Sequence, residues 1–358
     1  MRIAVLGLGL IGGSVGLAAR ERVYGAELVG FDPVPEAVEA ALERGAIHVA
    51  AESVAEALAG ARACLCCAPV GALPQLVAEA LAAAGRDCIV SDVGSTKRAI
   101  AASIDDERFV GGHPVAGAET AGIQHARADL FEGATWYLTP GDRASGLLYE
   151  RLHRLVAALG AHPLAIDPDT HDRLLAVVSH LPHVLANVLV SRVAGRVKAE
   201  GEALPRVGPS FRDATRVAGA NPAIWGDIYA TNGPAIAAEI DAAAAALGEV
   251  AEALRAGDTE RIAAWSEAAR ADRERVLETE IVGGPVRELR LVVPNRPGIV
   301  AQVALALGRA GVNIVDMALA PAADMSSGAM TLWVTGDDTA ARARELIEEL
   351  GFAVGAGR

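Results

Sequence analysis

The feature that most constrains the fold of this chain is a glycine pattern near its start. Gly7, Gly9 and Gly12 form the pattern G-x-G-x-x-G directly after a short apolar, strand-like run, and a helical pattern follows them. Asp32 ends the next strand-like run, twenty residues after the last glycine. A strand, a glycine turn, a helix and an acidic strand end at this spacing predict a β-α-β unit that binds a dinucleotide.

Each glycine of this pattern has a separate physical purpose in such a unit. Gly7 permits the tight turn, Gly9 lets the backbone approach a pyrophosphate, and Gly12 lets the helix pack closely on the strand. The first helical turn includes Leu10 and Ile11. Its backbone N–H groups face the phosphates together with the positive end of the helix dipole.

Asp32 indicates which dinucleotide is bound. Its carboxylate would accept hydrogen bonds from the adenosine ribose hydroxyls and would repel a 2′-phosphate. Residues 33–36 contain no Arg or Lys that could hold such a phosphate. The predicted cofactor is therefore NAD rather than NADP. Pro69, which follows the strand-like run 63–68, is assigned to the same cofactor site.

The alternation of strands and helices continues beyond this unit. Residues 63–68 and 88–92 have the apolar composition of buried strands, and a helix is predicted to begin at Gly94. This order predicts a Rossmann-type, doubly wound parallel sheet, whose ligands bind beyond the carboxyl ends of the strands. Ser95 and His113 both follow strand-like runs, so their positions make them candidates for the site.

Composition narrows the class of protein and its compartment. The 358 residues are 52% hydrophobic and 22% charged, which excludes global disorder, and the net charge of −13 argues against a nucleic-acid partner. Three of the four cysteines lie within residues 64–67, which favours reduced, buried thiols in a cytoplasmic protein. The uncharged stretch 3–19 has the composition of a signal peptide. Its glycines fit the β-α-β unit better, so a signal peptide is not predicted. No membrane association is predicted either.

From residue 169 onwards the pattern becomes helical and rich in alanine. Residues 235–254 are apolar around most of the predicted helix, and a helix with little polar face is normally buried. We infer burial against a second copy of the chain, and therefore a homodimer. Burial within one chain is the alternative.

The final part of the chain has the pattern of a separate small domain. After a Gly-Gly-Pro sequence at 283–285, which is typical of a linker, the elements follow the order β-α-β-β-α-β of a ferredoxin-like domain. The predicted domains are a Rossmann-type unit over 1–168, an all-helical substrate-binding and dimerisation unit over 169–282, and a ferredoxin-like unit over 286–358.

Five separated motifs over about residues 1–280 resemble the prephenate dehydrogenase family, and the C-terminal domain resembles an ACT domain, a small regulatory module. The motifs occur in order at 7–12 (GLGLIG), 92–97 (DVGSTK), 112–119 (GHPVAGAE), 179–183 (SHLPH) and 211–216 (FRDATR). In this family position 118 is often Thr, whereas this chain has Ala118. That departure affects the expected specificity and not the reaction class.

The resemblance implies NAD-dependent oxidative decarboxylation of prephenate to 4-hydroxyphenylpyruvate in tyrosine biosynthesis. It implies that His113 is the general base for the 4-hydroxyl of the substrate and that Ser95 hydrogen-bonds the same hydroxyl. An imidazole, with a reference pKa of about 6.5, suits this work at neutral pH. The resemblance also implies that His183, Arg216 and Glu119 bind the substrate, and a guanidinium matches a carboxylate bidentately.

Other roles and activities remain open from the sequence. His180 and His183 form H-x-x-H, but no third ligand has usable spacing, so no metal is predicted and His180 is assigned a structural role. An arogenate dehydrogenase would share the whole scaffold. A 3-hydroxyacid dehydrogenase would need a catalytic lysine in the helical part, where Lys198 is badly placed. A non-catalytic regulator that senses NAD and an amino acid would not need His113.

The ACT-like tail predicts regulation by an amino acid, with tyrosine, the end product of the pathway, as the effector. The loop that contains Asn295, Pro297 and Gly298 precedes a predicted helix, whose N-terminal N–H groups could hold a carboxylate. Asn313 opens the next strand and could add a polar contact. The alternative is an ACT fold retained only for assembly.

Overall fold

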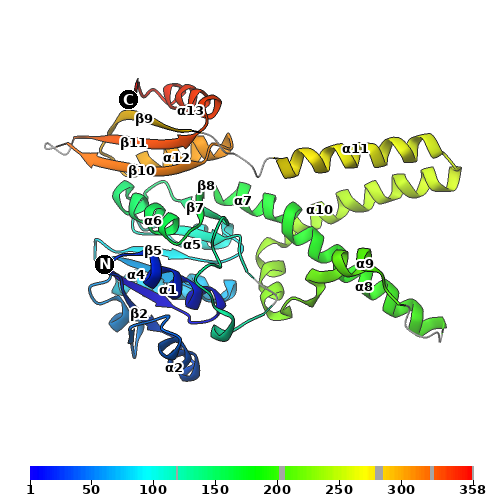
Figure 1. The fold of residues 1–358 in the computed structure, drawn as a ribbon, viewed down its shortest axis with the longest axis horizontal. Coiled ribbons are helices and arrows are strands. Elements are labelled where there is room, and N and C mark those ends of the chain that lie inside the picture. The colour runs from blue at the N-terminus through cyan, green and yellow to red at the C-terminus, as the bar shows by residue number, and fades with distance from the viewer. Residues whose placement is uncertain (118–119, 201–205, 279–284, 323–325, 357–358) are drawn as a thin grey trace.

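The structure is a computed structural model that describes residues 1–117, 120–200, 206–278, 285–322 and 326–356. Figure 1 shows an α/β body at the N-terminal end, with a smaller sheet-and-helix unit packed on it at the C-terminal end. Long helices from the middle of the chain extend to one side of both units. Glu119, Ala118 and the two linker glycines of the 283–285 sequence lie outside the described residues.

The α/β body is built on a five-stranded parallel sheet with the strand order β3-β2-β1-β4-β5. Its strands are β1 (Arg2–Leu6), β2 (Glu27–Phe31), β3 (Val49–Ala50), β4 (Ala63–Cys66) and β5 (Ile89–Asp92). Its helices are α1 (Leu10–Arg22), α2 (Pro35–Glu43), α3 (Val54–Leu58), the 3-10 turn η1 (Val70–Ala72) and α4 (Leu73–Ala83). All four residues of β4 and of β5 are buried, as expected for strands covered on both faces.

A second sheet of three strands adjoins the first and differs from the prediction of parallel strands throughout. It consists of β6 (Val110–Pro114), β7 (Thr135–Pro140) and β8 (His162–Ala165), with α5 (Arg98–Ser103), η2 (Ile123–His125) and α6 (Gly146–Ala158) around it. The β6–β7 pair is antiparallel, whereas β7–β8 is parallel. A parallel bridge between Val90 and Phe109 connects the two sheets. In the described part of the connection between β6 and β7, η2 is a single 3-10 turn and no α-helix occurs, and the chain reverses direction between the two strands.

The middle of the chain is helical, as predicted. Its elements are α7 (Pro168–Leu175), the π-helical turn η3 (Ala176–His180), α8 (Leu181–Glu200), α9 (Pro209–Thr215), η4 (Arg216–Gly219), α10 (Pro222–Ala256) and α11 (Thr259–Glu278). Within α10, Ile236 and Ala253 are buried in the chain, whereas Leu247 and Leu254 are each 61% exposed. Packing within one chain therefore covers only part of this apolar helix. By length and composition alone, the run Pro168–Arg196 could cross a membrane, although it contains buried polar residues.

The C-terminal unit has the predicted order β-α-β-β-α-β. It contains β9 (Val286–Pro294), α12 (Ile299–Arg309), β10 (Ile314–Pro321), β11 (Ser327–Thr335), α13 (Asp337–Glu349) and β12 (Val354–Ala356), in an antiparallel sheet of order β10-β11-β9-β12. It is docked on the α/β body. His153 of α6 lies 3.1 Å from the carbonyl oxygen of Ile314, and a Cβ on Gly308 would overlap the carbonyl oxygen of Ala165.

Candidate active site

The glycine loop between β1 and α1 has the geometry of a phosphate-binding turn. Gly7 has φ of +97°, and a Cβ there would clash with the carbonyl oxygen of Cys67. A Cβ on Gly12 would clash with the carbonyl oxygen of Gly7, whereas nothing lies within 4 Å of a Cβ built on Gly9. Gly9 also has no side chain to cap α1. The N–H groups at Leu10 and beyond therefore face open space, which fits a pyrophosphate.

Asp32 lies directly after β2 and also holds this loop in shape. Its Oδ2 accepts a hydrogen bond of 2.7 Å from the N–H of Leu8, and its Oδ1 accepts one of 2.9 Å from the N–H of Val34. Pro69 is exposed at the carboxyl end of β4, the strand next to β1. These residues fit the adenosine and phosphate parts of a dinucleotide.

A buried ion pair lies at the carboxyl end of β5. Lys97 and Asp92 have completely buried side chains, and the Lys97 ammonium donates to Asp92 Oδ2. The Asp92 carboxylate also accepts hydrogen bonds from the N–H groups of Gly94 (2.8 Å) and Gly112 (3.1 Å). Burial lowers the pKa of Lys97, and the attraction of Asp92 opposes that shift. This pair joins the loop after β5 to β6, the strand that carries His113.

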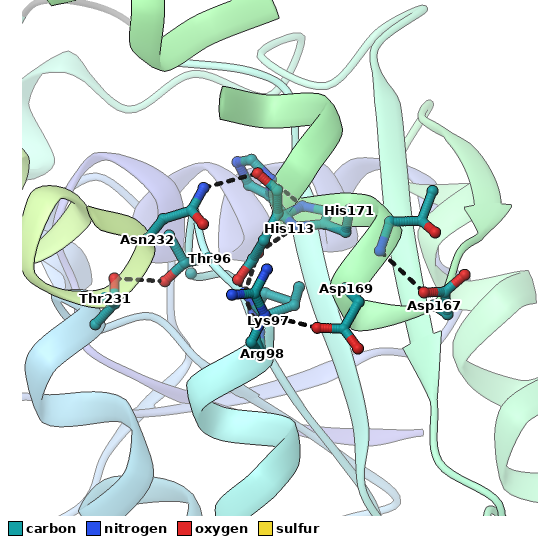
Figure 2. Close-up of polar contacts among 12 residues, drawn as sticks. Thr96, Lys97, Arg98, His113, Asp167, Asp169, His171, Thr231 and Asn232 are labelled. Atoms are coloured by element: carbon teal, nitrogen blue, oxygen red, sulfur yellow. Dashed lines mark hydrogen bonds and ion pairs between the residues drawn. The ribbon is translucent and has the colours of Figure 1, made fainter. Parts of the chain in front are cut away.

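His113 is buried on β6 and begins a chain of hydrogen bonds (Figure 2). Its Nδ1 lies 2.9 Å from Nε2 of His171, and Nδ1 of His171 lies 2.8 Å from Oδ1 of Asp172. The Asp172 carboxylate further accepts the N–H groups of Lys97 (2.8 Å) and Arg98 (3.0 Å). These two bonds also explain why α5 begins at Arg98 and not at Gly94, since Asp172 caps the helix start.

The loop that carries Ser95 is held from both sides. Ser95 itself is half-buried. Thr96 Oγ1 lies 2.9 Å from Thr231 Oγ1 of α10 (Figure 2), and the next residue, Lys97, is bound through its N–H to Asp172. The helical part therefore fixes the segment on which Ser95 is presented.

His183 of α8 has a different environment from His113. Its ring is stacked on Trp225, with the ring centroids 3.5 Å apart and the planes 3° from parallel. Its Nδ1 lies 2.6 Å from the Tyr229 hydroxyl and 3.1 Å from Asn187 Nδ2. Burial lowers the pKa of His183. Stacking and hydrogen bonding hold this ring in one orientation.

Arg216 and Glu119 are the other two residues predicted to bind the substrate. Arg216 begins η4, is exposed, and belongs to a segment packed against α8. Glu119 lies outside the described residues. His180 is buried, with Nδ1 3.2 Å from Asn232 Nδ2, which agrees with a structural role. Within the described ranges, no group of three His, Cys, Asp or Glu side chains is arranged to hold a metal ion.

Sequence reasoning missed His171, Asp172, Trp225 and Tyr229. His171 lies 58 residues from His113, so no local spacing rule connects the two. The adjacent His171 and Asp172 lie among polar residues, just before the apolar run that begins at Leu174, so the sequence gives only a weak signal that they are buried and have partners. Trp225 and Tyr229 are four apart on α10 and so share one helix face.

The parallel sheet, the glycine loop, the buried histidine chain and the separate helical part define a nucleotide-dependent dehydrogenase scaffold. Two family models match the chain: the nucleotide-binding domain of prephenate dehydrogenase over residues 15–164 and its dimerization domain over residues 167–267. The chain belongs to the prephenate dehydrogenase family.

Individual relatives agree with this assignment. A prephenate dehydrogenase of Bacillus subtilis (strain 168) is 29% identical over 354 residues, which are 97% of this chain and 95% of that protein. A cyclohexadienyl dehydrogenase of Zymomonas mobilis is 30% identical over 261 residues, 72% of this chain and 89% of that protein.

Solved structures show the same scaffold. Prephenate dehydrogenase from A. aeolicus, in complex with hydroxyphenyl propionate and NAD+, superposes with a TM-score of 0.73 at 26% identity, over 77% of this chain and 98% of that chain. Synechocystis arogenate dehydrogenase superposes with a TM-score of 0.67 at 26% identity, over 77% of this chain and 100% of that chain.

Proposed function

We propose that the protein is an NAD-dependent prephenate dehydrogenase, which converts prephenate to 4-hydroxyphenylpyruvate in tyrosine biosynthesis. The observation that carries the proposal is the buried His113, hydrogen-bonded through His171 to Asp172, in a chain with a dinucleotide-binding glycine loop. The arogenate dehydrogenase among the similar structures makes arogenate the second candidate substrate. NADH formation measured with prephenate and arogenate side by side tests the proposal, and turnover of neither substrate would refute it.

The residues of the chain divide the chemistry among them. The glycine loop and Asp32 would hold NAD, which would supply the acceptor for the hydride that leaves C4 of the substrate as CO2 leaves C1. His113 takes the proton of the 4-hydroxyl, and Ser95 hydrogen-bonds that hydroxyl. Arg216 binds a carboxylate of the substrate, His183 is a further substrate ligand, and Glu119 either interacts with the side-chain end of the substrate or connects the subunits. Burial lowers the pKa of His113, so the imidazole is neutral and ready to accept a proton at physiological pH.

Asp32→Ala is expected to lower kcat/KM with NAD by about 10- to 100-fold, because a charge-assisted hydrogen bond contributes about 1.5–3 kcal/mol. The value with NADP should fall less, since the repulsion of the 2′-phosphate disappears. The ratio of the two cofactor efficiencies, measured at saturating prephenate, therefore decreases. Glu36→Ala, at an exposed residue of α2, is the matched control. An unchanged ratio in Asp32→Ala would contradict the placement of Asp32 beside the ribose.

The pH dependence follows from the environment of His113. Burial, followed by His171, Lys97 and His180, lowers the pKa of His113 well below its ordinary value of 6.5. A base must be deprotonated to act, and a lowered pKa keeps it deprotonated to lower pH. We expect kcat/KM for prephenate to stay level as pH falls to 6.5 and to decrease only below it. An acidic limb with its midpoint at or above 6.5 would contradict this.

We propose that the chain works as a cytoplasmic homodimer with three domains, divided as 1–168, 169–282 and 286–358. The exposed apolar side chains of the helical part support the dimer, since isolated helices with such faces normally pack against another surface. They include Val188 and Leu189 on α8 and Leu247 and Leu254 on α10. Buried thiols at Cys64 and Cys66 agree with a reducing compartment.

We propose that the C-terminal unit is an ACT domain that binds tyrosine in a cavity of about 170 Å³ between β9–α12 and α6. The cavity is lined by Asn295 and Pro297, and by Arg296 and Glu107. Charges of both signs suit the carboxylate and ammonium groups of a free amino acid. Gly298 instead donates its N–H to the carbonyl of Ala144 at 3.0 Å.

Arg296→Ala is expected to raise the tyrosine concentration for half-inhibition by about tenfold or more, because the variant loses the cation that would hold the carboxylate. The measurement is a tyrosine titration of NADH formation at several prephenate concentrations. Arg342→Ala, on α13 outside the cavity, is the control and should respond like the parent protein. Equal responses of the two variants, or inhibition purely competitive with prephenate, would refute this location. Asn313 does not line the cavity.

A further inference from the structure

The contacts behind His113 determine which of its two ring nitrogens carries the proton. A neutral imidazole has one N–H donor and one acceptor nitrogen, and the hydrogen bond made by one nitrogen decides the role of the other. Asp172 lies at the far end of this chain of contacts. Its protonation state determines which nitrogen of His171 carries the proton, and His171 in turn determines this for His113.

Asp172 is an ionised acceptor. Its two oxygens receive the backbone N–H groups of Lys97 and Arg98 at 2.8 and 3.0 Å, and Oδ1 also faces His171. Burial raises the pKa of this carboxyl, but the bonds from His171, Lys97 and Arg98 outweigh burial, and the pKa lies below its ordinary value. An ionised carboxylate has no proton to donate. The contact at 2.8 Å therefore requires Nδ1 of His171 to be the donor.

With Nδ1 donating to Asp172, the other ring nitrogen of His171, Nε2, can only accept a hydrogen bond. Burial lowers its pKa, although Asp172 opposes the shift, so the ring is neutral and its single proton is on Nδ1. Its Nε2 carries a lone pair, and the only way to use that lone pair in the 2.9 Å contact is for Nδ1 of His113 to donate. The reverse arrangement would direct a lone pair of His171 at the Asp172 carboxylate.

The position of the His171 ring is itself fixed. Tyr137, which pairs with His113 across β6 and β7, packs edge-on against His171 with centroids 5.4 Å apart and planes at 85°. The side chain is completely buried. Asn232 donates to the backbone carbonyl of Asp172 at 2.7 Å and so holds α7 against the kinked part of α10 (Figure 2).

We propose that His171 is a positioning residue that, oriented by Asp172, holds His113 in the Nδ1–H tautomer and so leaves Nε2 as the basic atom offered to the substrate hydroxyl. The proposal rests on the proposed dehydrogenase function only for its kinetic consequence. The tautomer is a property of the protein without substrate. When Nε2 takes the hydroxyl proton, the imidazolium formed on His113 keeps its Nδ1–H bond to His171.

The test combines kinetics with a direct reading of the tautomer. His171→Leu removes the acceptor, and His171→Gln restores an amide oxygen that can accept the His113 Nδ1–H. We expect His171→Leu to lower kcat by about 10²- to 10⁴-fold, as for a base in the wrong tautomer, with KM for prephenate changed less than threefold. The kcat of His171→Gln should be at least about tenfold higher than that of His171→Leu. His162→Gln, at an exposed histidine of β8, is the control and should leave kcat unchanged.

The ¹⁵N chemical shifts of the His113 ring, measured in the full-length protein without substrate, should show a protonated Nδ1 in the parent protein and in His171→Gln. That signature should be lost in His171→Leu. A protonated Nε2 in the parent protein would overturn the proposal, as would a kcat for His171→Leu within threefold of the parent. If His171→Leu does not fold, the ¹⁵N chemical shifts of the parent protein and of His171→Gln still show which nitrogen of His113 is protonated. Failure to turn over prephenate or arogenate would refute the proposed function and leave the ¹⁵N result valid.

Discussion

His113→Asn is expected to lower kcat by about 10²- to 10⁴-fold, which is the usual contribution of a positioned acid–base group. Asn is close in volume, and its amide can occupy the place of Nδ1 and retain the contact with His171. It has no nitrogen that can accept the hydroxyl proton. Because His113 lies on β6, away from the glycine loop, the dissociation constant of NAD should change less than threefold. Stopped-flow NADH formation and NAD titration of the variant provide the two measurements.

The matched control for this variant is His125→Asn, at an exposed histidine in η2. It should leave kcat unchanged. A His113→Asn enzyme with kcat near that of the parent would exclude His113 as the base. A parallel loss of NAD binding would instead indicate a structural defect in the α/β body.

The parts of the site that could be predicted from the sequence depend on short-range patterns. Gly7, Gly9, Gly12 and Asp32 lie within one β-α-β unit, where turn geometry and strand length determine the spacing. The structure places all four as the pattern requires. The C-terminal β-α-β-β-α-β order was also predicted, because each element has its own hydrophobic period.

The parts that could not be predicted depend on contacts between distant segments. The hydrogen bond between His113 and His171 joins β6 to α7, two elements that are 58 residues apart at these positions. The start of α5 at Arg98, later than predicted, depends on a carboxylate supplied by Asp172. The antiparallel direction of the β6–β7 pair could not be predicted either. Strand periodicity shows which face of a strand is buried, but it does not show the direction of the neighbouring strand.

The sequence suggested an interface between the C-terminal unit and the catalytic part as one possible site for tyrosine, but it did not show the contacts that dock the two units. The docking depends on a close backbone approach of Gly308 to Ala165 and on the hydrogen bond between His153 and Ile314. Neither glycine nor histidine at these positions has a distinctive local pattern. The docking matters for function because the cavity proposed for tyrosine lies between the same two units, with Glu107 on one side and Arg296 on the other.

Lys97→Met is expected to reduce the free energy of unfolding by about 3–5 kcal/mol, the typical cost of removing one partner of a buried ion pair. Methionine is similar in length and fits the same space, but it leaves the Asp92 carboxylate buried without its counter-charge. The N–H groups of Gly94 and Gly112 still bond to that carboxylate, which places the loss at the lower end of the range.

The measurement is urea unfolding of the full-length protein, followed by far-ultraviolet circular dichroism. Arg62→Met is the control, because it breaks an exposed ion pair with Asp87, and such pairs contribute about 0–1 kcal/mol. A loss in Lys97→Met no larger than that of the control would mean that the Lys97–Asp92 ion pair does not stabilise the folded protein. The double variant Lys97→Met with Asp92→Asn distinguishes the cases: if the charge of Asp92 is the cause, the second substitution restores stability, since no unpaired charge remains buried.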